Sequence, residues 1–253
     1  ENRAARPETA FGDTLSTTLA GYSPRMRPWT MALLNEMNLR GSSSFYRDRF
    51  ADAGDFTFCF VGAFDIAKMK PLVETWLGSL PTKGRKETWR DNGIRPPDGV
   101  VKKTVRKGIE PKSQTRIVFT GPFEWNLRNR YIFESLASAL RIRLREVLRE
   151  DMGGTYGVSV GGSLERFPKP EYTFSFGFGS APDRAGELAG TVFSLIDSVK
   201  TDGFAATYLE RVKETQLRQR EVNLKNNSFW LGILQTYISN GDDPRDLLKY
   251  PDL

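Results

Sequence analysis

The 253-residue sequence contains no histidine and one cysteine. Without histidine, the chain by itself cannot form a Ser-His-Asp or Cys-His nucleophile system or a histidine-ligated zinc site. The single Cys59 excludes an internal disulfide framework and any multi-cysteine metal site. It lies in the apolar run FTFCFVG, where we expect a buried core thiol. Unless it uses an unusual carboxylate or Ser/Lys mechanism, the chain alone is not a hydrolase.

Long apolar runs and blocks of one charge are also missing. No run approaches the roughly 20 apolar residues of a membrane span, and residues 1–25 carry no signal-peptide pattern. The net charge is +6, but 37 basic residues are interspersed with 31 acidic ones. A nucleic-acid role is therefore kept only as a minor alternative, because such a domain needs a basic stripe. The sequence is compatible with a location in the periplasm and with one in the cytosol.

Hydrophobic periodicity predicts a chain of mixed secondary structure. The long helix over 126–151 carries a single apolar stripe, and Tyr172, Phe174, Phe176 and Phe178 share one face of a strand. The expected strands are 55–63, 100–105, 115–121, 155–164 and 172–180. Strands joined by short connections, with the helices clustered, indicate an α+β fold in which helices pack on one face of a mainly antiparallel sheet. The segment 81–99 is rich in proline, glycine and charge, which predicts a domain boundary there.

The end of the long helix offers two further kinds of chemistry. The carboxylates Glu146, Glu150 and Asp151 could hold a metal ion, but flanking arginines favour a solvated ion-pair face. The arginines of this region could contact phosphates, but they do not share one face, which favours the polar back of an amphipathic helix. The set consists of Arg128, Arg130, Arg141, Arg143, Arg145 and Arg149.

The stretch LREDMGGTYGVSV, residues 148–160, joins that helix to the next strand by a tight corner. Gly153 would supply a left-handed helix stop, and Arg149 would interact with the helix C-terminal dipole. This interpretation explains the glycines and the arginine. It does not explain why Tyr156 begins the strand so close to them.

Four stretches in order resemble the C-terminal half of the pitrilysin/insulinase family of zinc metallopeptidases, especially its long bacterial members. They are FTFCFVGAFD, IAKMKPLVETWLGSLP, LREDMGGTYGVSV and NNSFWLG. The resemblance implies two homologous halves, each of two α+β domains, which enclose a chamber. The zinc motif belongs to the N-terminal half, so the resemblance implies no metal ligand in this chain. Residues 1–90 would end the third domain, 91–99 would be a linker, and 100–253 would form the fourth domain, truncated near its C-terminus.

The resemblance also implies a function for the corner. Tyr156 would donate a hydrogen bond to the scissile carbonyl, Arg149 would hold a substrate carbonyl or the same oxygen, and Gly153 and Gly154 would position both. The partners implied are the N-terminal catalytic half, on the same polypeptide or a partner subunit, and peptide substrates, with no nucleic acid. A bacterial periplasmic or cell-envelope location is favoured. The alternative is a catalytically inactive scaffold or binding subunit of the same fold.

Overall fold

The computed structural model describes residues 5–252 except residues 152, 154 and 156. The chain divides into two units, Glu1–Gly108 and Ile109–Leu253. The division lies shortly after residues 91–99, where the sequence predicts a linker. The assignment of these parts to two peptidase domains remains a prediction.

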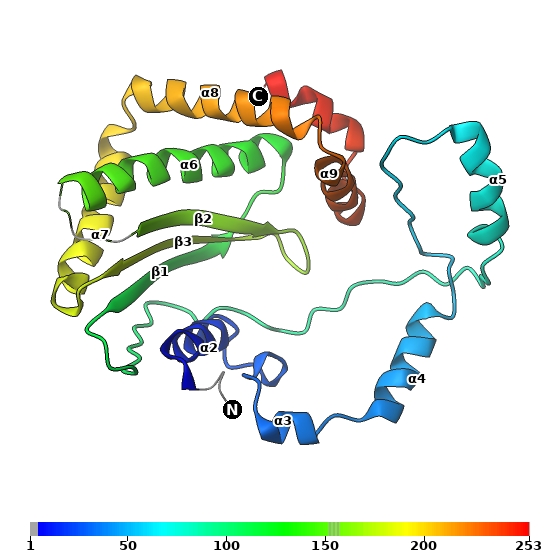
Figure 1. Cartoon of the computed structure of the whole chain (residues 1–253), viewed down its shortest axis with the longest axis horizontal. Helices are drawn as coiled ribbons and strands as arrows, with labels where there is room; N and C mark the ends of the chain where they lie inside the picture. The colour runs from blue at the N-terminus through cyan, green and yellow to red at the C-terminus, as the bar shows by residue number, and fades with distance from the viewer. Residues whose placement is uncertain (1–4, 152, 154, 156, 253) are drawn as a thin grey trace. The chain divides into compact units, whose positions relative to one another are not determined.

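The second unit is built on a three-stranded antiparallel sheet (Figure 1). Its strands are β1 (Ser113–Pro122), β2 (Gly157–Glu165) and β3 (Glu171–Ser180), in the order β1-β3-β2. The register pairs Phe119 with Phe174, and Val160 with Phe176. Apolar side chains alternate along each strand, so they gather on one face of the sheet. The strands predicted at 115–121 and 172–180 are confirmed, and the one predicted at 155–164 is confirmed from Gly157 onward.

Two helices cover the apolar face of this sheet. Helix α6 (Leu127–Arg145) and helix α7 (Ala185–Asp202) contribute Leu144, Leu188 and Val192, which have no exposed surface. They pack with the phenylalanines of β3 in one core cluster. A short 3-10 helix, η3 (Pro182–Arg184), precedes α7. The α+β fold with helices on one face of an antiparallel sheet is therefore confirmed.

The remaining helices lie on the other side of α6 from the sheet and at its N-terminal end. They are α8 (Ala206–Asn223), α9 (Asn227–Asn240) and the 3-10 helix η4 (Pro244–Asp252). Helix α8 runs alongside α6 (Figure 1), and its Gln216 carbonyl accepts hydrogen bonds from the Tyr131 and Ser135 hydroxyls of α6. These contacts make α6 the central helix of the unit.

The carboxylate of Asp242, just after α9, joins three segments. It pairs with Arg130 of α6 at 3.0 Å and with Arg166, in the β2–β3 connection, at 2.7 Å. It also accepts a hydrogen bond from the Trp125 indole at 3.3 Å. Both arginines lie over the Trp125 ring. The end of α9 is thereby attached to the start of α6 and to the hairpin.

The regular elements in the described part of the first unit are helices. Its elements are α2 (Pro7–Leu19), the 3-10 helix η1 (Pro24–Met26), α3 (Met31–Asn35), α4 (Leu39–Phe50) and α5 (Ile66–Trp76). No helix in the described residues of the chain is long and apolar enough to cross a membrane.

The strands predicted at 55–63 and 100–105 are wrong for this structure, because neither segment is assigned as strand. A strand exists only when a neighbour satisfies its backbone groups, and the described residues of the first unit include no strand. The side chains of Phe56, Phe58 and Phe60 are consequently 37–44% exposed. Cys59 is partly buried there, not the buried core thiol that the sequence predicts.

Candidate functional site

The helix that leads to the glycine corner changes its geometry before it ends. Helix α6 stops at Arg145, and a single π-helical segment, η2 (Glu146–Asp151), follows it. The predicted helix over 126–151 is thus right in extent, but its last turn is wider. Leu148 in this turn has no exposed surface, so the turn is anchored in the core.

Glu146, the first residue of η2, is bound by side chains of α8. The Tyr208 hydroxyl donates a hydrogen bond to one oxygen of its carboxylate, and the Arg211 guanidinium lies 3.1 Å from the other. Arg143 adds a longer ion pair at 3.8 Å. The hydrogen bond to Glu146 is the main cause that raises the pKa of Tyr208 above its ordinary value, because the carboxylate favours the protonated phenol. The turn before the corner is thus attached to α8.

The chain after the corner is attached to the sheet. Gly153 has a φ of +58°, in the left-handed region that the helix-stop interpretation requires. The Thr155 hydroxyl donates to the Gly179 carbonyl at 2.7 Å, and it accepts a hydrogen bond from the Gly157 amide at 3.1 Å. Both arms of the corner are therefore tied to neighbouring elements, which restrains the backbone on each side of it.

The two residues assigned to catalysis are not placed by this geometry. The backbone of Arg149 belongs to η2, but its side chain lies outside the described residues, as do Tyr156 and Gly154 entirely. Their roles, and the positioning role of Gly153, remain predictions. Tyr208 was missed by sequence reasoning, since nothing in the sequence connects it with Glu146.

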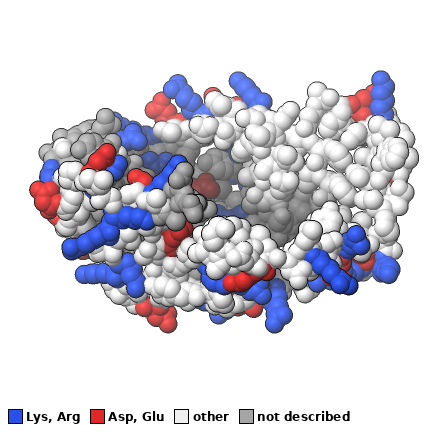
Figure 2. All heavy atoms as spheres, turned by 60° about the horizontal axis from the view of Figure 1, so that its bottom comes forward, with Lys and Arg blue, Asp and Glu red and all other residues white. Residues whose placement is uncertain are grey.

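The arginines of α6 have separate functions in the structure. Arg130 pairs with Asp242, and Arg143 with Glu146. Arg141 donates two hydrogen bonds to the Val160 carbonyl of β2, at 3.0 and 2.6 Å. Arg143 fits the polar back of an amphipathic helix, whereas Arg130 lies in a largely buried ion pair and Arg141 bonds the sheet. On the face drawn in Figure 2, basic and acidic side chains are interspersed over the surface.

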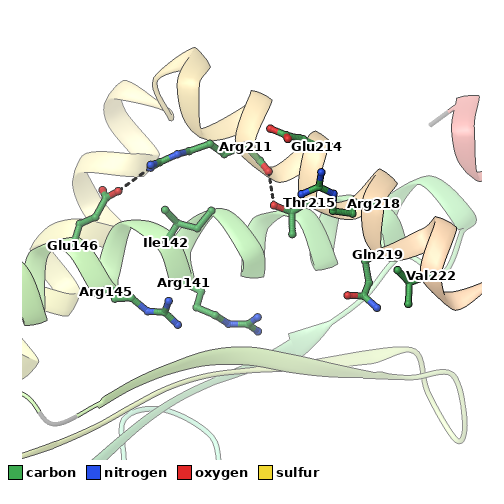
Figure 3. Close-up of a pocket in the computed structure, with 10 residues that line it drawn as sticks. All are labelled: Arg141, Ile142, Arg145, Glu146, Arg211, Glu214, Thr215, Arg218, Gln219 and Val222. Carbon is green, nitrogen blue, oxygen red and sulfur yellow. Dashed lines mark hydrogen bonds and ion pairs between the residues drawn. The ribbon is translucent and has the colours of Figure 1, made fainter.

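Arg141 and Arg145 also line a hollow of about 700 Å³ between α6 and α8 (Figure 3). On the α8 side it is lined by Arg211, Glu214 and Arg218, among others. No pattern in the sequence predicts this hollow, because the residues of α8 lie some 70 positions away from those of α6 and meet them only in the fold.

The residues that the structure describes do not fit a zinc ion. The sequence has no histidine, and the described residues hold no group of three or more side chains that could bind a metal. Glu146, a member of the carboxylate cluster considered above, is engaged by Tyr208 and Arg211. The ion-pair interpretation of Glu146 is therefore supported.

Two proteins similar to this chain are described as proteases and are several times longer than it. A protein of Haemophilus influenzae named "Probable zinc protease PqqL" is 25% identical over 212 residues, which cover 82% of this chain and 22% of that protein. The structure of the periplasmic protease PqqL from Escherichia coli matches with a TM-score of 0.82 and 19% identity, over 96% of this chain and 27% of that one. The chain thus spans about a quarter of the length of these relatives.

A shorter solved structure carries the same fold. The peptidase M16 inactive domain from Pseudomonas fluorescens matches with a TM-score of 0.68 and 13% identity, over 98% of this chain and 59% of that one. A family model described as "Peptidase M16 inactive domain" matches residues 43–216, most of the chain, including α6, the corner and the whole sheet. The chain therefore belongs to the peptidase M16 family of zinc proteases, in which it corresponds to the inactive domain.

Proposed function

We propose that this chain is the C-terminal, non-zinc-binding half of a zinc metalloendopeptidase. The observation that carries the proposal is the match of residues 43–216 to the M16 inactive domain, in a chain that has no histidine with which to bind zinc. In this proposal the zinc belongs to an N-terminal catalytic half, on the same polypeptide or a partner subunit. This chain closes the substrate chamber against that half.

The corner after α6 supplies the residues that act on the substrate. The Tyr156 hydroxyl donates a hydrogen bond to the oxygen of the scissile carbonyl as negative charge develops on it. Arg149 holds a substrate carbonyl or the same oxygen. Such donors act because they are aimed in advance at the developing charge. The ties of Glu146 to α8 and of Thr155 to β3 support this role, since they restrain the backbone on both sides of the corner.

The substrates in this proposal are peptides, and the compartment is the bacterial periplasm or cell envelope. The similarity to a protein described as a periplasmic protease supports the location. The absence of histidine supports the division of labour between two halves, because this chain cannot build the family's histidine-containing zinc motif.

The role of Tyr156 is tested by Tyr156→Phe in the full-length protein. We expect turnover of a quenched fluorescent peptide to fall by about 100-fold or more, the effect of losing one oxyanion donor. Zinc content and thermal stability should stay unchanged. The matched control is Tyr46→Phe, which removes the hydroxyl of an exposed tyrosine in the first unit. Unchanged turnover in Tyr156→Phe would remove Tyr156 from the mechanism.

The proposal as a whole is tested by the same assay on this chain alone and on the full-length protein, each with and without a chelator. We expect activity only in the full-length protein, abolished by the chelator. Inactivity of both would favour an inactive scaffold or binding subunit. Chelator-resistant activity of this chain alone would contradict the proposal.

A further inference from the structure

The hollow between α6 and α8 is dominated by positive charge. Its charged lining consists of Arg141, Arg145, Glu146, Arg211, Glu214 and Arg218. The side chains come from two helices: Figure 3 shows Arg141 and Arg145 extending from α6 toward the sheet, and Arg211 reaching from α8 to Glu146. The volume of the hollow, about 700 Å³, lies in the range of sites that hold a small ligand or a few residues of a peptide. We call this space the α6–α8 groove.

The contacts within the groove leave two of its arginines available. Arg211 is engaged with Glu146, and Arg141 with the Val160 carbonyl. Arg145 and Arg218 form no ion pair or hydrogen bond in the part of the chain that the structure describes, and both are exposed. A guanidinium has a planar fork of donors that matches a carboxylate, and it keeps its charge at any working pH. Two such groups on facing helices suit an acidic ligand.

The setting of the groove favours a peptide over a nucleic acid. Arg141 lines the groove and hydrogen-bonds the Val160 carbonyl of β2, so the groove lies beside this strand. Strand β2 is an edge strand, because it pairs with β3 on one side and has no strand on the other in the described sheet. Bases need aromatic platforms for stacking, and the residues that line the groove are aliphatic, polar or charged. Glu146 and Glu214 would also repel a continuous phosphate backbone, whereas a peptide can present carboxylates at separate positions.

We propose that the α6–α8 groove binds a carboxylate-rich segment of an extended peptide, with Arg145 and Arg218 as its carboxylate partners. The groove then gives the full-length protein a preference for acidic segments of its substrates. This preference rests on the function proposed above, but binding itself requires no zinc. Because the charges are exposed, binding weakens as salt concentration rises.

The test is peptide binding by the full-length protein in the presence of a chelator, so that hydrolysis cannot interfere. Fluorescein-labelled hexaglutamate and hexaglutamine peptides are titrated with protein, and fluorescence anisotropy gives the dissociation constants. The variant is Arg145→Gln/Arg218→Gln. Its matched control is Arg128→Gln/Lys213→Gln, which removes the same charge from exposed positions of the same two helices outside the groove.

We expect the parent protein to bind hexaglutamate more tightly than hexaglutamine. The groove variant should bind hexaglutamate about tenfold more weakly, since each exposed charge pair contributes modestly, and the control should stay within about twofold. Equal binding of the two peptides, or equal loss in variant and control, would overturn the proposal. Tighter binding of a single-stranded oligonucleotide than of hexaglutamate, lost in the groove variant, would also overturn it. Acidic-peptide binding by a full-length protein without peptidase activity would leave the groove standing and refute the enzymatic function.

Discussion

At the scale of single residues, Asp242 joins charges that are far apart in the sequence and largely shielded from water. Its side chain is 13% exposed and that of Arg130 is 14% exposed. Removing one member of such a pair is costly, because the other charge stays buried without compensation. Arg166, which also hydrogen-bonds the Asn240 carbonyl, would lose its ion pair at the same time.

The first prediction concerns this carboxylate. Asp242→Asn should lower the free energy of unfolding by about 3 kcal/mol, because Arg130 would lose its counter-ion. Urea denaturation followed by circular dichroism measures the change. The control is Asp246→Asn, whose pair with Lys249 is more exposed and should contribute less than about 1 kcal/mol. Equal effects of the two substitutions would contradict the structural role of Asp242.

A second prediction at the scale of single residues concerns Gly153. Its φ of +58° is unfavourable for a side chain, above all for a β-branched one, although among the described residues no atom beyond its chain neighbours lies within 4 Å of the position of a Cβ atom. Gly153→Val should therefore cost about 2 kcal/mol of stability through backbone strain alone. Gly153→Asn should cost distinctly less, because asparagine enters the left-handed region more readily. Thermal denaturation compares the two, and an equal loss would argue against strain.

At the scale of elements, a carboxylate organises a loop of the first unit. Asp52, just after α4, accepts backbone hydrogen bonds from Gly54 at 2.9 Å, Arg85 at 3.0 Å and Lys83 at 3.1 Å. The bonds from Gly54 and Arg85 are the main causes that lower the pKa of Asp52 from 3.8 to about 2. The fold therefore favours the ionised form.

The pH dependence of stability follows from this shift. A carboxyl whose pKa is lower in the folded state stabilises the fold above its ordinary pKa, and that contribution is lost as pH falls. We expect the melting temperature of the parent protein to drop between pH 4 and pH 2 more steeply than that of Asp52→Asn, which cannot titrate at this position. Parallel curves for the two proteins would show that Asp52 is not a source of the dependence.

The elements that the sequence predicts correctly are those whose signal is local. Helix α6 and strand β3 each carry a continuous apolar stripe, and both partners of β3 precede it in the same unit. The segment 55–63 has an equally apolar pattern, but a strand also needs a neighbour, which no pattern within the segment reveals. The same distinction applies to the candidate site. Arg149 and Tyr156 lie in one short motif, so the sequence alone can suggest them, whereas the contact of Glu146 with Tyr208 joins residues 62 positions apart and is seen only in the fold.

At the scale of the whole molecule, the first unit exposes many large apolar side chains. Trp29, Phe45, Tyr46 and Trp76 are all more than half exposed, and the phenylalanines of 55–63 add to them. Exposed apolar surface of this kind marks a site of association. In the function proposed above, the rest of a longer protein would cover part of it.

The last prediction is that this chain alone associates with itself at concentrations where the full-length protein does not. Sedimentation velocity over a range of concentrations measures this. Phe58→Ser, on the exposed run, should reduce the association of the isolated chain, whereas Leu248→Ser, exposed in the second unit, should have less effect. A concentration-independent monomer for the isolated chain would contradict the expectation.

The position of Asp242 also sets the order in which the second unit can be completed during synthesis. Trp125 precedes it by 117 positions and Arg166 by 76, so both emerge from the ribosome long before their partner. Until residue 242 is translated, Arg130 at the start of α6 and Arg166 of the hairpin lack this counter-ion. The sheet and α6 can assemble earlier, but their attachment to the end of α9 must wait for residue 242.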